Sequence, residues 1–147
     1  MAHKPHTYVN TFAQLGAREF IFHSEATTHH ADILEDIRMH GMKAGIAFNP
    51  ETPISHHKDA LIHADIALIM TVHPGFSGQQ FDARPLNKIM EIRTYNPLVS
   101  TGIDGGVNLT NAKRVRLANA DFACSASAIL ASPHPKTAYA ALQKALK

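Results

Sequence analysis

The chain has 147 residues, of which 45% are hydrophobic and 18% charged, and its formal net charge is +2. This composition is typical of one folded domain, and the scattered Lys and Arg residues predict no nucleic-acid partner. The longest apolar run, residues 64–72, is interrupted by Asp65 and is far shorter than the roughly 20 residues of a membrane span, so no membrane partner is expected.

The single cysteine, Cys124, cannot form a disulfide within the chain, which fits a cytoplasmic protein. The first residues contain no apolar segment of the kind found in signal peptides. The 11 histidines are unusual. They are either zinc ligands or solvated side chains, and no pair has the spacing of a structural zinc site.

Helical and strand patterns alternate from the beginning of the chain. The spacing of apolar residues predicts a helix over 8–15, which Gly16 ends. A short aromatic and β-branched run predicts a strand over 19–23. In chain order, the patterns then predict a helix over 31–40, a strand over 43–48, a helix over 54–63 and a strand over 65–72.

The second half of the chain repeats this alternation after a turn rich in glycine. It predicts, in chain order, a helix over 85–95, a strand over 98–103, a helix over 109–118, a strand over 121–125 and a helix over 137–146. Strands that alternate with helices over short connections predict a parallel sheet of the α/β class. Because several strands are apolar on both faces, the sheet is either covered by helices or closed into a barrel.

Three strand ends are candidate sites, since the carboxyl ends of barrel strands carry the active site. Residues 70–79 form either a phosphate-binding turn or an ordinary loop. The second strand end carries Asp104, whose side chain is a base, a metal ligand or a turn acceptor. The small residues at 125–129 suit an anion at a helix N-terminus. His23, at the first strand end, is either a substrate contact or a core residue.

Five segments together resemble the successive signatures of ribulose-phosphate 3-epimerases, in the family's order and spacing. They are residues 22–26, 43–45 with 49–53, 70–79, 104–107 and 127–129. The resemblance implies that residues 1–147 are a single partial domain, the C-terminal five strand–helix units of a (β/α)8 barrel of the ribulose-phosphate-binding type. The related allulose-6-phosphate epimerases share much of this pattern.

The resemblance implies a metal-dependent isomerase of carbohydrate metabolism. Such an enzyme inverts C3 of a ketose phosphate, converting D-ribulose 5-phosphate to D-xylulose 5-phosphate in the pentose phosphate pathway. Two aspartates exchange the C3 proton through an enediolate, and a divalent metal of the Zn, Fe, Mn or Co class stabilises the charge that develops. Other phosphate-barrel enzymes, such as decarboxylases, are an alternative that the segments at 49–53 and 70–72 disfavour.

By position in the family pattern, Asp104 is the second catalytic aspartate and a metal ligand. The same comparison assigns substrate and phosphate contacts to Met70, Gly75, Phe76, Ser77, Gly78, Gly105, Gly106, Ala126 and Ser127. Two residues depart from the pattern. Ala126 replaces a glycine, so that its methyl group could crowd the anion. Gly102 replaces a glutamate beside the catalytic aspartate, which could loosen the positioning of Asp104.

The resemblance also implies that the sequence begins in the loop after the third strand of the barrel. The first aspartate and the metal histidines then precede it, so we expect negligible turnover by this chain alone and weak binding of phosphosugars. Bare sheet edges at 19–23 and 121–125 predict self-association. The inward side chains that we expect to lack cover are Ile46, Phe48, Leu68 and Ile103. The alternative function is an inactive remnant or a phosphate-binding module.

Overall fold

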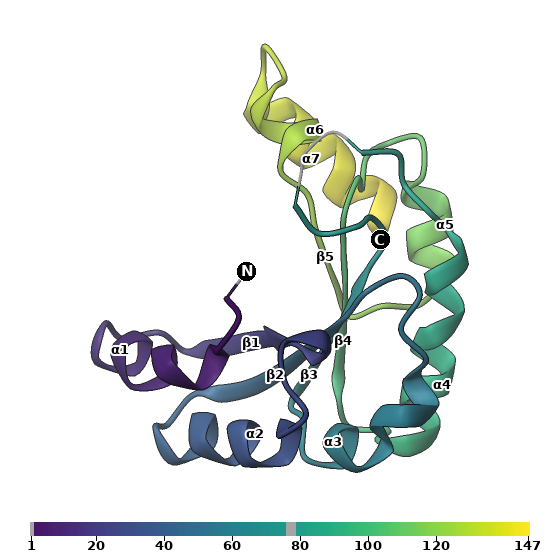
Figure 1. Ribbon diagram of the computed structural model, residues 1–147. Helices are drawn as coiled ribbons and strands as arrows, with labels where there is room; N and C mark the ends of the chain where they lie inside the picture. Colours follow the sequence, from purple (N-terminus) through teal and green to yellow (C-terminus); the bar gives the residue numbers. More distant parts are fainter. Residues whose placement is uncertain (1, 76–78) are drawn as a thin grey trace.

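The computed structural model describes residues 2–75 and 79–147, which fold around a five-stranded parallel sheet (Figure 1). The strands are β1 (Glu19–His23), β2 (Lys43–Phe48), β3 (Ile66–Met70), β4 (Ser100–Asp104) and β5 (Phe122–Cys124), paired in that order. The α-helices are α1 (Val9–Gln14), α2 (His30–Met39), α3 (Lys58–Ile62), α4 (Lys88–Tyr95), α5 (Ala112–Leu117), α6 (Ser127–Leu130) and α7 (Pro135–Leu146).

The predicted order of elements is confirmed, and the bounds of β1 and β2 are those expected from the sequence. Several predicted helices begin with a 3-10 turn rather than an α-helical one. The 3-10 turns are η1 (Pro5–Tyr8), η2 (Ser24–Ala26), η3 (Ile54–His57) and η4 (Arg84–Asn87). The short helix α6 follows β5, where the sequence indicated a run of small residues suited to an anion at a helix N-terminus.

Helices α2 to α5 lie along the outer side of the sheet (Figure 1). The buried core lies between these helices and the strands. Ile46, Phe48 and Ile103 are each 0% exposed and belong to this core. The expectation that these three residues point inward without cover was therefore wrong. Leu68 is the exception, since it lies on the other face and is half-buried. Alternate residues of a strand point to opposite faces of the sheet. When both faces are apolar, the sequence does not show which of the two sets faces the helices.

The inner face of the sheet carries side chains that lie in register across the strands. One row is formed by His23, Ala47, Leu68, Gly102 and Phe122, and the next row towards the carboxyl ends by Met70, Asp104 and Cys124. A Cβ atom built at Gly102 would lie 2.2 Å from Cζ of the Phe122 ring. The ring of Phe122 thus occupies the space that a side chain at position 102 would need.

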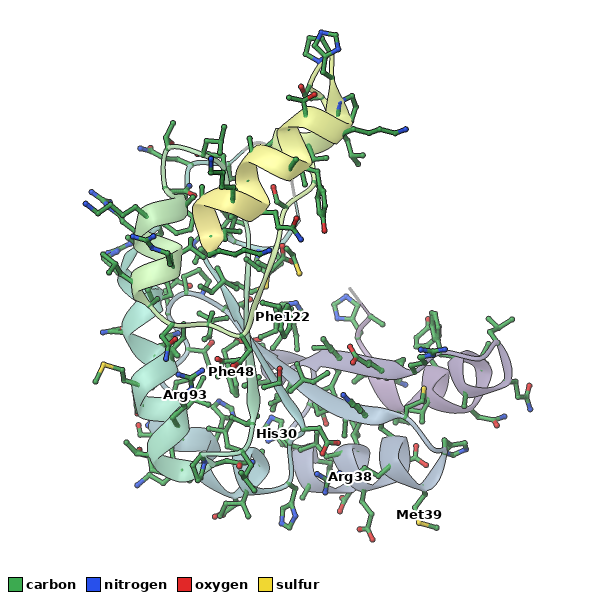
Figure 2. The ribbon with its side chains drawn as sticks, turned by 180° about the vertical axis from the view of Figure 1, so that it is seen from behind. His30, Arg38, Met39, Phe48, Arg93 and Phe122 are labelled. Carbon is green, nitrogen blue, oxygen red and sulfur yellow. The ribbon has the colours of Figure 1, made fainter. Side chains whose placement is uncertain are left out.

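The opposite end of the sheet is held by two similar clamps of one aspartate and one arginine. Asp65, directly before β3, accepts hydrogen bonds from the Ala44 N–H at 2.9 Å and from Arg38 of α2 at 2.8 Å. Asp121, directly before β5, accepts hydrogen bonds from the Thr101 N–H at 2.7 Å and from Arg93 of α4 at 3.3 Å. Each clamp ties a helix to two adjacent strands, and Figure 2 labels the two arginines, Arg38 and Arg93.

We expect Asp65→Ala and Asp121→Ala each to lower the free energy of unfolding by about 1–3 kcal/mol, because each leaves a buried backbone N–H without its acceptor. Urea unfolding measures the effect. The matched control is Glu19→Ala, which removes only an exposed pair with Lys43 at 3.9 Å, and it should change stability by less than about 0.5 kcal/mol. Equal losses in all three variants would show that the clamps are ordinary surface pairs.

Strands β1 and β5 form the two edges of this sheet. A cavity of about 700 Å³ lies beside β1 and includes Phe12 and Phe20, and one of about 410 Å³ lies beside β5 and includes Phe122 and Leu142. Among residues 2–75 and 79–147, no helix has the length and apolarity needed to span a bilayer.

Candidate active site

A cavity of about 340 Å³ opens at the carboxyl ends of β3, β4 and β5. It brings together the sequence-predicted site residues that the structure describes, namely Met70, Gly75, Asp104, Gly105, Gly106, Ala126 and Ser127. Phe76, Ser77 and Gly78 lie outside the described residues. His23, which the sequence left between a substrate contact and a core residue, also lines the cavity.

Asp104 is the last residue of β4, and its side chain lies half-buried in the cavity. Burial raises the pKa of this carboxyl group above its ordinary value of 3.8, and the N–H of Gly105 and the neighbouring His23 imidazole oppose that rise only in part. Among the described residues, Asp104 forms no ion pair with a lysine or an arginine. A carboxyl group in this setting holds a proton at higher pH than an exposed aspartate.

The backbone after Asp104 is fixed by Thr71, which is fully buried at the end of β3. The single proton of its hydroxyl is shared between the carbonyls of Asp104 at 3.0 Å and Gly105 at 2.5 Å, and its N–H donates to the Asp104 carbonyl at 2.8 Å. Gly105 and Gly106 have φ values of 119° and 65°, a region that side-chain-bearing residues rarely adopt. The two glycines are therefore required where the chain turns beside the cavity.

The third predicted strand end, after β5, closes the far side of the cavity. The hydroxyl of Ser125 donates a hydrogen bond to the Val107 carbonyl at 2.8 Å, which ties the end of β5 to the loop after β4. Ala126 has φ −110°, so its backbone does not need glycine. The departure from the family pattern at this position therefore adds a methyl group without straining the chain.

The expected metal centre does not fit the residues that the structure describes. Asp104 could offer one carboxylate ligand, but residues 2–75 and 79–147 contain no group of three or more His, Cys, Asp or Glu side chains that could hold a metal ion. No reaction step is therefore assigned to a metal held by these residues.

A parallel sheet flanked by helices, with a carboxylate and glycine turns at the strand ends, defines a protein of the (β/α)8-barrel class. Solved structures agree with this fold. A 3-hexulose-6-phosphate synthase from Salmonella typhimurium matches 97% of the chain with a TM-score of 0.73 at 12% identity, and the match covers 67% of that structure. A thiamine phosphate pyrophosphorylase from Pyrococcus furiosus matches 94% with a TM-score of 0.66 at 17% identity, over 63% of its own length.

The chain belongs to the ribulose-phosphate 3 epimerase family, whose sequence model matches residues 1–130. It is 36% identical over 151 aligned positions to the ribulose-phosphate 3-epimerase of Mycobacterium leprae, and 37% identical over 134 to that of Escherichia coli. These alignments cover 98% and 87% of the chain, but 66% and 59% of the respective relatives. The family resemblance and the barrel fold expected from the sequence are confirmed.

Proposed function

We propose that this chain provides the phosphate-binding loops and one proton-transferring carboxylate of a ketose-phosphate 3-epimerase. The substrate pair is D-ribulose 5-phosphate and D-xylulose 5-phosphate, and the reaction belongs to carbohydrate metabolism. The observation that carries this proposal is the position of Asp104, half-buried in one cavity with Gly75, Gly105 and Gly106. The single cysteine is consistent with a cytoplasmic location for such an enzyme.

In the proposed reaction, Asp104 takes the proton from C3, which the neighbouring carbonyl group makes weakly acidic. Its raised pKa suits this step, because a general base is most effective when its pKa approaches the working pH. Backbone N–H groups of the glycine turns would bind the phosphate at the other end of the substrate, since turns of this kind form concave anion sites. Phosphate binding then positions C3 beside the carboxylate.

Inversion also needs an acid on the opposite face of the substrate. Within residues 2–75 and 79–147, Asp104 is the only Asp or Glu side chain that lines the cavity. We therefore expect this chain alone to bind ketose phosphates more readily than it converts them. We further propose that a second chain pairs with the β1 or β5 edge, and a sharp monomer peak in light scattering at high concentration would contradict that pairing.

Titration of the chain with D-ribulose 5-phosphate tests the binding site. The expected result is a saturable shift in the amide NMR resonances of Gly75, Gly105 and Gly106, with inorganic phosphate shifting the same resonances. Gly16 and Gly41 do not line the cavity and serve as internal controls. Unmoved resonances at saturating concentrations of both ligands would rule out the proposed phosphate site.

A phosphate-binding module without turnover is the second candidate, and the lack of a metal-binding group in the described residues favours it. A coupled epimerase assay with added Zn²⁺, Mn²⁺, Co²⁺ or Fe²⁺ separates the two. Turnover that disappears in Asp104→Asn supports the enzyme. Binding without turnover under every metal supports the module.

A further inference from the structure

His23 lies at the boundary of two cavities. It ends β1 with its ring on the inner face of the sheet, and it lines both the cavity of Asp104 and the larger cavity beside β1. Its side chain is 20% exposed. The ring thus shares a cavity with Asp104 and remains accessible from it.

One edge of the His23 ring faces a carboxylate. Nδ1 lies 3.5 Å from Oε2 of Glu25, and this buried nitrogen has no hydrogen bond of ordinary geometry. Within residues 2–75 and 79–147, Nε2 makes no hydrogen bond to the protein and is not among the buried atoms without a partner. Nε2 is therefore the ring atom that remains for a ligand.

Glu25 is held in place as an ionised carboxylate. Burial alone would raise its pKa, but the nearby His23 imidazole and the hydrogen bonds from the Thr52 hydroxyl and the Asn49 N–H together hold the pKa well below the usual range. Oε1 accepts the Asn49 N–H at 3.0 Å and also the Thr52 hydroxyl. The negative charge beside His23 is thus present over the whole physiological range of pH.

The same short segment is fixed from its other side by Lys88 of α4. The Lys88 ammonium group donates hydrogen bonds to the carbonyls of Asn49 and Thr52, each at 2.8 Å. Residues 49–52 therefore donate hydrogen bonds to Glu25 and accept hydrogen bonds from Lys88. This arrangement leaves Glu25 little freedom to move away from the imidazole.

We infer that His23 binds a hydroxyl group of the phosphorylated sugar and that Glu25 is the positioning residue that prepares it. The carboxylate favours the tautomer that carries its proton on Nδ1, because that proton then faces the negative charge 3.5 Å away, and the partner of one ring nitrogen determines the protonation of the other. Nε2 is then an acceptor, and a sugar hydroxyl in the Asp104 cavity donates to it. This inference rests on the proposed function, and it adds a residue that distinguishes a sugar phosphate from phosphate alone.

Binding of two ligands to matched variants tests the role of His23. In isothermal titration calorimetry, His23→Leu should weaken the binding of D-ribulose 5-phosphate about tenfold, the value of one lost hydrogen bond. The affinity for inorganic phosphate should remain unchanged. His23→Gln retains an acceptor and should restore most of the affinity. His134→Leu, on an exposed turn, is the control and should alter neither ligand.

The positioning role of Glu25 is tested by the ¹⁵N NMR spectrum of the His23 ring in the unliganded chain. The expected spectrum shows the Nδ1-protonated tautomer in the wild type and a shift away from it in Glu25→Gln. An Nε2-protonated ring in the wild type would overturn the inference, as would unchanged sugar-phosphate affinity in a folded His23→Leu variant that still binds phosphate. Failure of the wild type to bind either ligand would instead reject the proposed phosphate site.

Discussion

Replacing Asp104 by asparagine is expected to stabilise the fold at neutral pH. Burial raises the pKa of this carboxyl group in the folded state, so that folding favours its protonated form. The protonated carboxyl group of Asp104 is compatible with the folded state, so its stabilising contribution is fully present below the unfolded pKa of about 4. That contribution is lost as the pH rises through the folded pKa, because the carboxyl group must then ionise while it is half-buried. Asparagine is neutral throughout and retains an oxygen that can accept the Gly105 N–H.

The difference in unfolding free energy between variant and wild type should be close to zero near pH 3.5. It should grow to about 0.5–2 kcal/mol in favour of Asp104→Asn at pH 7, the usual size of a single stabilising substitution. Urea unfolding at a series of pH values measures it. Glu35→Gln, the same kind of change on an exposed position of α2, is the control. A variant less stable than the wild type at pH 7 would mean that the carboxylate is structural.

The same substitution should remove proton transfer at C3. A positioned base contributes roughly 10²–10⁴-fold to such a step, so the incorporation of deuterium at C3 of D-ribulose 5-phosphate in heavy water should fall by that factor. Exchange needs only one base, and it can therefore be measured even where inversion is too slow. Equal exchange rates in Asp104→Asn and the wild type would assign the proton transfer to another group.

Local patterns in the sequence were sufficient to predict most of the fold. β1 and β2 are short apolar runs, and Gly41 before β2 and Asn49 after it mark where that strand begins and ends. The side of the sheet that each strand residue faces could not be predicted in this way. Phe48 was expected to point inward and is part of the helix-covered core, because β2 is apolar at every position but its first and gives no sign of its parity.

The candidate site was predicted through strand-end motifs, and the structure brings the described members of that set into one cavity. The part that could not be predicted depends on contacts between residues distant in sequence. Glu25 meets Asn49 and Thr52 from 24 and 27 positions away, and Lys88 reaches the same segment from 39 and 36 positions away. No local pattern reports such contacts, although His23 and Glu25 both lie in one of the recognised motifs.

Phe122 illustrates the same limit for a departure from the family pattern. The absence of a glutamate at Gly102 suggested a loosened Asp104, but the ring of Phe122 from the neighbouring strand occupies that space. A glycine and an aromatic residue 20 positions later therefore act as one packing unit. The departure at position 102 is a replacement of a polar side chain by a hydrophobic contact, rather than a void beside the carboxylate.

Gly105→Ala is expected to have the largest effect on the fold. Gly105 has φ 119°, and an added Cβ atom would lie 2.6 Å from Cγ2 and 3.0 Å from the backbone nitrogen of Val72. Backbone strain of this kind and overpacking each cost about 1–3 kcal/mol, so a loss of about 2–4 kcal/mol is expected in urea unfolding. Because the Thr71 hydroxyl binds the Gly105 carbonyl, the loops after β3 and β4 should separate and phosphate binding should be lost.

Gly41→Ala distinguishes the two sources of that cost. Gly41 also has a positive φ, 77°, but an added Cβ atom there meets nothing within 4 Å. Its loss should therefore be limited to backbone strain, about 1 kcal/mol, with phosphate binding retained. The excess loss in Gly105→Ala measures how closely the loops after β3 and β4 approach each other. If the two variants are equally destabilised, the turn at Gly105 requires only a positive φ, and the contact with Val72 does not hold the cavity together.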